Sequence, residues 1–416
     1  MVLRVDSDRM RADFDALATF GATPDGGVER TTFSEAHVAA RAWFLDRARD
    51  AGLEPHVDLA ANHSAVLPAR DPGARTLLLG SHLDSVRRGG RYDGALGVIC
   101  ALEVLRAVRD ADLDLPVALE AIDFTDEEGT LIGTLGSCAL AGRLSPELLA
   151  APRGGREVLV AELERMGLTE AGVREARRDP ATLAGYLELH IEQGPVLERA
   201  GADIGIVTGI TGASSFHVVF DGETRHAGTT PMDARRDAAV GAAAFVLGVR
   251  ETAMRTFRGC VATVGDIATE PGSFNVVPGR ARLRLECRSL DSAELDALER
   301  ALIEQAHEAA REFGLAVTVE PVGRLEPSPT DMSVRAACAT AAAALGLTTL
   351  ELPSGAGHDA QSLAPLTPSG VVFVPSAGGI SHDPSEHTSW EHCVNGANVL
   401  LGAAVQLADR ARVVPV

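Results

Sequence analysis

Hydrophobic positions in the first 200 residues alternate between helical and strand spacing. Residues 34–51 carry apolar side chains at helical spacing and end at Gly52, and a further helix is predicted over residues 95–108. Strands are predicted at residues 56–66, 76–80, 116–124 and 185–191. Strands that alternate with helices in this order are typical of an α/β sheet covered by helices.

The pattern changes near Gly209. After it, strands are predicted at residues 216–220, 261–267, 280–287 and 315–322. Long helices are predicted at residues 234–254 and 292–313. This order predicts a small α+β domain with a four-stranded antiparallel sheet and two helices. The α/β pattern then resumes with a helix at 332–345 and a strand at 370–375. We therefore predict an α/β protein whose large domain, with a central mixed sheet, comprises residues 1–211 and 328–416, with the small domain, residues 212–327, inserted.

Composition and charge narrow the possible partners. The chain has 416 residues, of which 46% are hydrophobic, and this length favours two cores over one. Its 38 basic and 58 acidic residues give a net charge of −20, so nucleic acid and membrane surfaces are poor partners. Every basic residue is arginine, which excludes chemistry that needs a lysine Schiff base or a P-loop lysine.

The cysteines and the N-terminus indicate the compartment. The 6 cysteines have no C-x-x-C spacing, which indicates reduced thiols rather than a disulfide framework or a zinc finger. The N-terminal segment carries charges every few residues, and no apolar run reaches the roughly 18 residues needed to cross a bilayer. We expect a cytoplasmic protein.

Predicted strands end in imidazole and carboxylate side chains. The segments are TLLLGSHLDS with His82 and Asp84, AIDFTDEEGT with Asp126, Glu127 and Glu128, GYLELHIEQG with His190 and Glu192, and FVPSAGGISHDPSEHT with His382, Glu386 and His387. Loops beyond the carboxyl ends of strands are where open α/β sheets build their sites. Histidine with carboxylate is a ligand set that suits zinc and its divalent neighbours.

Each segment also has a structural explanation. Asp93, in GGRYDGALGV just before a predicted helix, would by itself be read as an N-cap. The acidic run 126–128 could form a solvated loop, although adjacent carboxylates repel one another and cations would neutralise them. The convergence of several strand ends on one kind of donor favours a metal site.

The order and spacing of several motifs match a known family. The motifs are SHLDS, GGRYDGALGV, DEEGT, LHIEQGPVLE, RHAGTTPMDARRDA, GAGHDA and GISHDPSEH. Together they resemble the N-carbamoyl-L-amino acid hydrolase and allantoate amidohydrolase family, within the aminoacylase and carboxypeptidase superfamily of dinuclear zinc hydrolases. HIEQGPVLE and RHAGTTPM distinguish this family from the peptidases of the superfamily, which usually carry an acidic ligand at the position of His190.

The resemblance implies two divalent metal ions per subunit. One ion would be held by His82, Asp93 and His190. The other would be held by Asp93, Glu128 and His382, so that Asp93 bridges the pair. Zinc is the first candidate, and Mn²⁺, Co²⁺ and Ni²⁺ also suit these ligands.

The resemblance also implies two catalytic roles. Asp84 matches a carboxylate that orients the ring of His82, which fixes the tautomer and raises the basicity of the ligand. Glu127 matches the general base, which accepts a proton from the metal-activated water and passes it to the leaving nitrogen.

Further family positions hold the substrate. They correspond to Gln193, His226, Asn275, Arg288, Gly357 and His358. Arg288 is suited to fork onto the α-carboxylate, and His226 and Asn275 are suited to polarise the carbonyl oxygen. In this family the inserted domain also acts as lid and forms a homodimer, in which His226 and Asn275 are expected to serve the neighbouring subunit's site.

The implied reaction is hydrolysis of a linear C–N amide bond in a ureido compound. The first candidate substrate is an N-carbamoyl-L-amino acid, which would give the L-amino acid, carbon dioxide and ammonia. Allantoate, a ureidoglycine-type compound and β-ureidopropionate are close alternatives. An aminoacylase or dipeptidase is disfavoured by His190, and a non-catalytic binding protein that retains the fold is disfavoured by Glu127.

A few positions depart from the family pattern. Leu131 and Ile132 stand where Arg-Phe is expected, Cys138 stands where arginine is common, and Thr224 with Arg225 precedes His226 where an Ala-Asp or Ala-Asn pair is commoner. All the proposed metal ligands are present, so these departures bear on the identity of the substrate.

Overall fold

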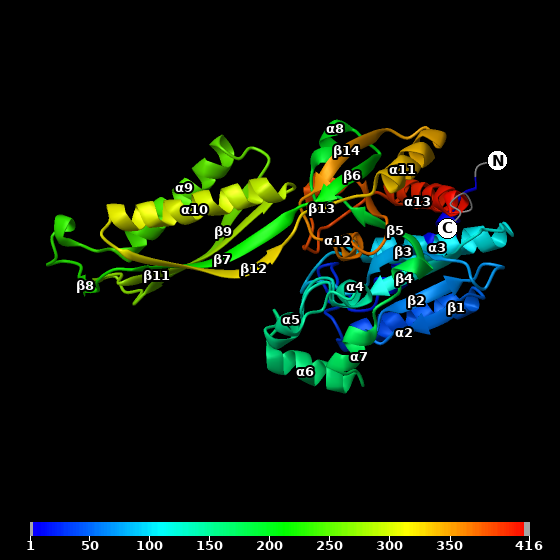
Figure 1. Ribbon diagram of the computed structural model, residues 1–416, viewed down its shortest axis with the longest axis horizontal. Coiled ribbons are helices and arrows are strands. Elements are labelled where there is room, and N and C mark those ends of the chain that lie inside the picture. Colours follow the sequence, from blue (N-terminus) through cyan, green and yellow to red (C-terminus); the bar gives the residue numbers. More distant parts are fainter. Residues whose placement is uncertain (1–2, 412–416) are drawn as a thin grey trace. The chain divides into compact units, whose positions relative to one another are not determined.

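The protein forms two compact units. The computed structural model describes residues 3–411. The first unit runs up to Thr208 and resumes at Thr330, and the second unit is Gly209–Pro329. The second unit is thus an insertion in the first. Figure 1 shows the elements of both units.

The first unit is built on a mixed sheet. Its strands follow the order β1-β2-β4-β3-β5-β15-β6, with β14 also paired to β6. The short β13, which belongs to the second unit, pairs with Gly209 and Ile210 at the end of β6. The four central strands run parallel to one another, namely β4, β3, β5 and β15. The pairs β1–β2, β2–β4 and β15–β6 are antiparallel. The bounds are β1 Glu54–Val57, β2 His63–Leu67, β3 Thr76–His82, β4 Ala118–Phe124, β5 Leu183–Ile191, β6 Ile204–Ile210, β13 Ser328–Pro329, β14 Thr349–Ser354 and β15 Ser369–Val374.

Helices cover both faces of this sheet. Five of them contribute apolar side chains to one core: α1 Ser7–Leu17, α2 Glu35–Asp50, α3 Ala95–Asp110, α11 Met332–Ala344 and α13 Trp390–Arg410. On the opposite face, α12 (Asp359–Leu363) donates the N–H of Ala360 to the Glu188 carboxylate of β5. The shorter helices of this unit are α4 Leu135–Leu140, α5 Pro146–Ala150, α6 Arg156–Arg165, α7 Glu170–Glu175 and α8 Val196–Ala200, with 3₁₀ turns at Pro180–Thr182 and Ala377–Gly379. A further 3₁₀ turn, Met232–Ala234, belongs to the second unit.

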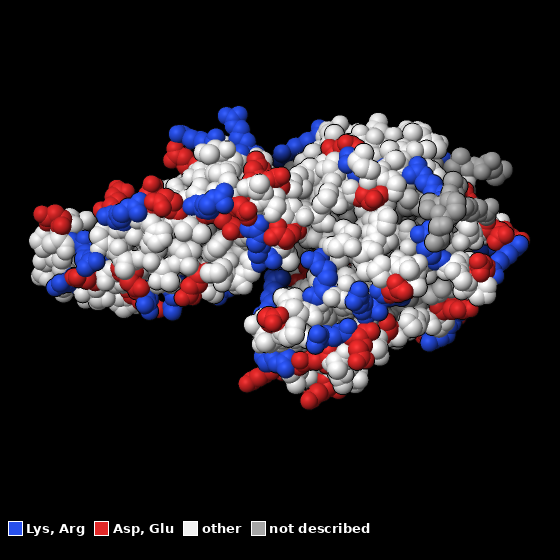
Figure 2. Space-filling model, viewed as in Figure 1, with Lys and Arg blue, Asp and Glu red and all other residues white. Residues whose placement is uncertain are grey.

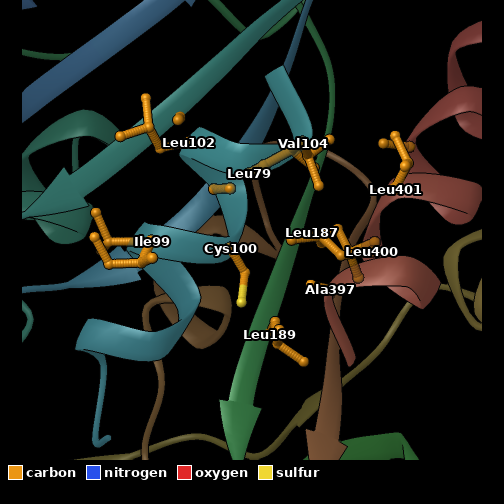
Figure 3. Close-up of a cluster of buried hydrophobic side chains, with 14 of the residues drawn as sticks. Leu79, Ile99, Cys100, Leu102, Val104, Leu187, Leu189, Ala397, Leu400 and Leu401 are labelled. Carbon is orange, nitrogen blue, oxygen red and sulfur yellow. The ribbon is translucent and has the colours of Figure 1, made fainter. Parts of the chain in front are cut away.

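The alternation of β5 separates the core from the polar face. Leu187, Leu189 and Ile191 point into the core, and Figure 3 shows the first two beside α3 and α13. Successive side chains of a strand point to opposite faces, so Glu188 and His190 face the other way. One strand therefore supplies both the core and the candidate site.

The second unit has its own sheet and core. Its strand order is β12-β7-β11-β9, all antiparallel. α9 and α10 pack on one face, where buried and exposed positions alternate along β7 and β11. A two-stranded ribbon, β8 with β10, completes the unit. The bounds are β7 Gly212–Asp221, β8 Arg225–His226, α9 Ala238–Arg255, β9 Val261–Glu270, β10 Val276–Val277, β11 Arg280–Ser289, α10 Ser292–Glu312 and β12 Ala316–Leu325.

The predicted fold class is confirmed, and the structure adds elements that the pattern did not predict. β6, with the sequence IGIVTGI, lies where the sequence indicated only a change in the hydrophobic pattern near Gly209. α13 contains Gly396 and Gly402, which lower intrinsic helix propensity. A Cβ on Gly396 would lie 2.6 Å from Val374 Cγ1, so close packing against β15 explains that glycine.

Exposed arginines and acids are paired over the surface. Figure 2 shows side chains of both signs next to one another on the visible face. Ion pairs of the second unit include Arg280 with Asp221, at 2.7 Å between Nε and Oδ1, and Arg255 with Glu251, also at 2.7 Å. Within residues 3–411, every helix is too short or too polar to cross a lipid bilayer.

Truncation in the shared core should destabilise the first unit. Leu102 of α3 is fully buried, so Leu102→Ala should lower the free energy of unfolding by about 2–5 kcal/mol through lost burial and a cavity. Leu113→Ala, at an exposed position just after α3, is the matched control and should change stability by about 0.5 kcal/mol or less. Urea unfolding measures both. Equal midpoints for the two variants would contradict this assignment of the core.

Candidate metal centre

The carboxyl ends of the four parallel strands bring the candidate ligands together. His82 is the last residue of β3, Glu128 follows β4, His190 lies near the end of β5, and His382 follows β15. Asp93 comes from the turn before α3. These ends share one edge of the sheet, which is where open α/β sheets place their sites.

Asp93 lies at the centre of this group. Its Oδ1 is 3.0 Å from His190 Nε2 and 3.6 Å from His82 Nε2. Its Oδ2 is 3.2 Å from His382 Nε2, and that nitrogen is 3.5 Å from Glu128 Oε2. The two oxygens of one carboxylate thus face two different sets of ligand atoms, each within 4.8 Å of one another.

Gly94 permits the close approach of Asp93 to the imidazoles. Its φ is +60°, and a Cβ there would lie 2.4 Å from the ring of His82. Glycine adopts positive φ without steric cost, so the chain can turn into α3 directly beneath the ring. A larger residue at this position would displace His82.

The hydrogen bonds of the His82 and His190 rings leave the Nε2 atom of each ring as an acceptor that faces the Asp93 carboxylate. His82 Nδ1 lies 3.0 Å from the backbone oxygen of Asp84, and His190 Nδ1 lies 2.9 Å from that of Ile191. Each Nδ1 therefore carries the proton of the neutral ring, and each Nε2 presents a lone pair to the Asp93 carboxylate. Lone pairs 3.0 to 3.6 Å apart in a buried site require a proton or a cation between them.

The donor set and spacing suit a divalent metal. Zinc bonds of about 2.0 to 2.1 Å in a tetrahedron place neighbouring ligand atoms about 3.3 Å apart. The distances around Asp93, 3.0 to 3.6 Å, bracket that value. The residues present therefore fit a metal at each of the two groups.

Protons compete with a metal ion for the position between the imidazole nitrogens and the Asp93 carboxylate. Burial disfavours the charged form of His190, but the hydrogen bond and charge of Asp93 outweigh it and raise the pKa of His190 to about 9. Burial alone dominates for His82 and lowers its pKa to about 4. Burial opposes ionisation of Asp93 as well, yet hydrogen bonds from His190 and His382 hold its pKa well below the usual range.

Two buried aspartates hold the turn that carries Glu127 and Glu128. Asp84 accepts the N–H of Glu127 at 3.3 Å and of Glu128 at 3.2 Å. Asp126 accepts three N–H groups farther along the turn, from Leu131, Ile132 and Gly133 (2.7 to 3.0 Å). Thr32 Oγ1 bridges the two aspartates at 3.0 and 2.9 Å. The acidic run is thus a folded, buried turn and not a solvated loop.

Asp84 acts on His82 differently from the expectation. The resemblance implies that its carboxylate orients the ring, but the carboxylate is 3.7 Å from Nδ1 and the backbone oxygen makes the hydrogen bond instead. The physical reason is that the amides of the acidic turn and the hydroxyl of Thr32 already occupy the carboxylate oxygens.

Glu127 is placed next to the first group. Its Oε2 lies 3.6 Å from His82 Nε2, and its side chain is 12% exposed. Burial raises its pKa well above the usual range, and the negative charges of Asp359 and Glu128 add to the effect. Burial and Asp93 likewise raise the pKa of Glu128. Cations beside them would reverse both shifts.

The HIEQG segment has two structural tasks. Glu192 accepts the N–H groups of Val196 and Leu197 and caps α8, so it is not a ligand. Gln193, at a φ of +57°, donates from Nε2 to Asp93 Oδ2 at 2.9 Å. The amide predicted to hold substrate thus also contacts the central carboxylate.

His358 is buried against the first group. Its ring centroid is 4.7 Å from that of His190, and its Nε2 is 2.8 Å from Ser354 Oγ. Glu188, His190 and His358 also place ligand atoms within 4.8 Å of one another. Gly357 is exposed beside this ring, and the predicted contacts of both residues with substrate stay predictions.

The remaining predicted substrate residues lie in the second unit. His226 and Asn275 are exposed and lie at the β8–β10 ribbon, where the N–H of Ala227 donates to the backbone oxygen of Asn275. Arg288, on β11, contacts Glu286 at 2.7 Å. Their role in binding stays a prediction.

Several residues of the site were not assigned roles from the sequence. They are Thr32, Asp126, Glu188, Ser381 and Glu386, all within hydrogen-bond distance of candidate ligands or of the turns that carry them. Glu386 stood in the GISHDPSEH motif, which was a usable signal. Ser381 stood in the same motif, whereas Thr32 gave no signal, because single hydroxyl residues are common in every loop.

Comparisons with known proteins agree with the motifs. The model of peptidase family M20/M25/M40 matches residues 78–406. The chain is 38% identical to an N-carbamoyl-L-amino acid amidohydrolase of Geobacillus stearothermophilus, over 97% of this chain and 99% of that protein. It is 32% identical to an allantoate amidohydrolase of Bacillus subtilis (strain 168), over 94% and 95%.

A solved structure shares the whole architecture. It is an amidase of the hydantoinase/carbamoylase family from Burkholderia multivorans, with a TM-score of 0.88, 34% identity and 98% of each chain covered. The predicted resemblance is confirmed. The chain belongs to peptidase family M20/M25/M40 and, within it, to the family of N-carbamoyl-L-amino acid and allantoate amidohydrolases.

Proposed function

We propose that this protein is a metal-dependent amidohydrolase that cleaves a linear C–N bond of a ureido compound, with an N-carbamoyl-L-amino acid as the first candidate substrate. The observation that carries the proposal is the Asp93 carboxylate, whose two oxygens face separate groups of histidine and carboxylate atoms. The names of two relatives, both N-carbamoyl-L-amino acid amidohydrolases, supply the substrate class. The B. subtilis relative makes allantoate the second candidate.

Two divalent ions per subunit would be held by the two groups. His82, Asp93 and His190 form one group, and Asp93, Glu128 and His382 form the other. When bound, such ions would polarise the substrate carbonyl and make water a stronger acid. Zinc is the first candidate, while Mn²⁺, Co²⁺ and Ni²⁺ accept the same ligands.

Glu127 would move the proton. Its carboxylate, 3.6 Å from His82 Nε2, accepts a proton from the attacking water as the new C–O bond forms. The same proton then passes to the leaving nitrogen as the C–N bond breaks. The carbamic acid that remains decomposes, so one N-carbamoyl amino acid and one water give one amino acid, one carbon dioxide and one ammonia.

The other assigned residues would bind the substrate. Gln193 holds Asp93 and presents its remaining amide atoms to substrate. Arg288 would exchange Glu286 for the substrate carboxylate, since a guanidinium forks onto either acid. We propose that His226 and Asn275 donate hydrogen bonds to the carbonyl oxygen of the substrate. Gly357 and His358 would line the substrate-binding pocket.

The second unit would form a homodimer. Val240, Leu247 and Met254 of α9 are exposed at intervals of seven residues and make one apolar stripe. β9 is an edge strand whose outer side has no partner strand among residues 3–411, and it exposes Val261 and Ile267. A second copy of the same surface would cover both features.

A cytoplasmic location also stays a prediction. The six cysteines are all free.

A substrate panel tests the proposed reaction. Purified protein with Zn²⁺, Mn²⁺, Co²⁺ or Ni²⁺ should release ammonia and free amine from N-carbamoyl-L-amino acids faster than from N-acetyl amino acids. Allantoate and β-ureidopropionate complete the panel. Complete metal removal should abolish turnover, and added metal should restore it. Full activity in metal-free protein, or a preference for N-acetyl substrates, would contradict the proposal.

Glu127→Gln should separate catalysis from metal binding. The amide cannot accept the proton, so kcat should fall about 10²- to 10⁴-fold while metal content stays unchanged. Glu391→Gln, at an exposed glutamate in the first turn of α13, is the matched control and should match wild type. Initial rates and elemental analysis give the two readouts. Near-normal kcat in Glu127→Gln would exclude Glu127 as the base.

Leu247→Glu should disrupt the dimer. A charge in the middle of the apolar stripe would be desolvated on association, so the mass measured by light scattering should fall from about twice 43.4 kDa to 43.4 kDa. Leu59→Glu, at an exposed leucine of the first unit, should leave the mass unchanged. A monomeric wild-type protein, or a dimeric Leu247→Glu variant, would refute this interface.

A further inference from the structure

Glu386 is a buried carboxylate that none of the roles above uses. It lies four residues after His382 and is 4% exposed. Its Oε1 accepts the N–H of Tyr92 at 2.9 Å and the N–H of Asp93 at 3.1 Å. Glu386 therefore holds the backbone of the central carboxylate from a position 293 residues away in the chain.

The other oxygen of Glu386 closes the loop that carries His382. Oε2 accepts the hydroxyl proton of Ser381 at 2.8 Å, and the N–H of Glu386 donates to the backbone oxygen of Asp383 at 3.0 Å. His382 sits inside this closed loop at a φ of +57°, a conformation that costs a non-glycine residue energy and persists only where its surroundings impose it.

Ser381 couples the same two elements through its side chain. Its Oγ is 3.2 Å from Asp93 Oδ2 as well as 2.8 Å from Glu386 Oε2. One hydroxyl has one proton, so the two carboxylates share a single donor. Gln193 Nε2 lies 3.2 Å from Ser381 Oγ and 2.9 Å from Asp93 Oδ2, so it donates to Asp93 when the Ser381 hydroxyl donates to Glu386.

The turn before Asp93 is shaped around this carboxylate. A Cβ on Gly90 would lie 2.1 Å from both Cδ and Oε1 of Glu386. A side chain at position 90 would therefore occupy the place of the carboxylate. The turn and the carboxylate fit each other without free space, as expected of a group that fixes a position.

We infer that Glu386 is a positioning residue that fixes Asp93 and His382 relative to each other and so sets the metal affinity of the Asp93, Glu128 and His382 group. Only this group takes a ligand from the loop that Glu386 closes. The His82, Asp93 and His190 group depends on Glu386 through Asp93 alone, and Gly94 with the two strand ends hold it independently. The inference rests on the proposed metal pair.

Metal titration of Glu386 variants tests this inference. Competition with a zinc chelator should show two bound Zn²⁺ in wild type and in the Glu391→Gln and Glu391→Ala controls. Glu386→Ala should retain one ion and bind the second about 10- to 100-fold more weakly, the usual effect of losing a group that orients a ligand. Glu386→Gln should lie between, because its amide oxygen still accepts the two backbone N–H groups.

Different failures of this experiment have different meanings. Two ions bound as tightly as in wild type, or equal weakening of both, would overturn the role of Glu386. A wild-type protein that binds no metal would instead refute the proposed function. If Glu386→Ala does not fold, Glu386→Gln and Ser381→Ala decide, and both should weaken only one ion. The visible absorption of the Co²⁺ forms, which reports coordination, should change for the same ion.

Discussion

The arrangement of the site depends on one electrostatic constraint. Asp93, His82 and His190 place only hydrogen-bond acceptors toward one another at 3.0 to 3.6 Å, in a buried position. Such a group is unstable unless a proton or a cation lies between its members. The second group, on the other oxygen of Asp93, also places an imidazole nitrogen beside two carboxylates, and its His382 is half exposed. Everything proposed about catalysis follows from filling these positions with divalent ions.

The fold meets this constraint because one face of a strand packs in the hydrophobic core while the other face carries ligands of the site. On β5 the leucines face the core and Glu188 and His190 face the site, so the packing that stabilises the sheet also fixes the ligands. The four parallel strands end at one edge, and short turns then deliver side chains from segments up to 300 residues apart. The turns are held by carboxylates, namely Asp84, Asp126 and Glu386, which accept backbone N–H groups.

Most of the fold could be predicted from hydrophobic periodicity. The long amphipathic segments, such as 292–313 for α10 and 280–287 for β11, have one period and one buried face, and periodicity locates such segments well. β6 and α13 were missed because glycines interrupt their patterns, and those glycines serve close packing that only the folded neighbours reveal.

The site could be predicted in its residue types but not in its supporting contacts. The motifs named side chains that do lie together, and their role as ligands remains a proposal. The hydrogen bond from His82 to a backbone oxygen, the contact of Gln193 with Asp93 and the closure by Glu386 depend on which atom of a residue faces which neighbour. A linear pattern carries no such information.

Anomalous diffraction from crystals grown with zinc would locate the ions that Asp93, His82, His190, Glu128 and His382 are proposed to hold. Data collected on both sides of the zinc absorption edge should show two peaks in each chain. One should lie within bonding distance of His82, Asp93 and His190, and the other within bonding distance of Asp93, Glu128 and His382. The absence of a peak beside Asp93, or peaks bound only by other residues, would contradict the account.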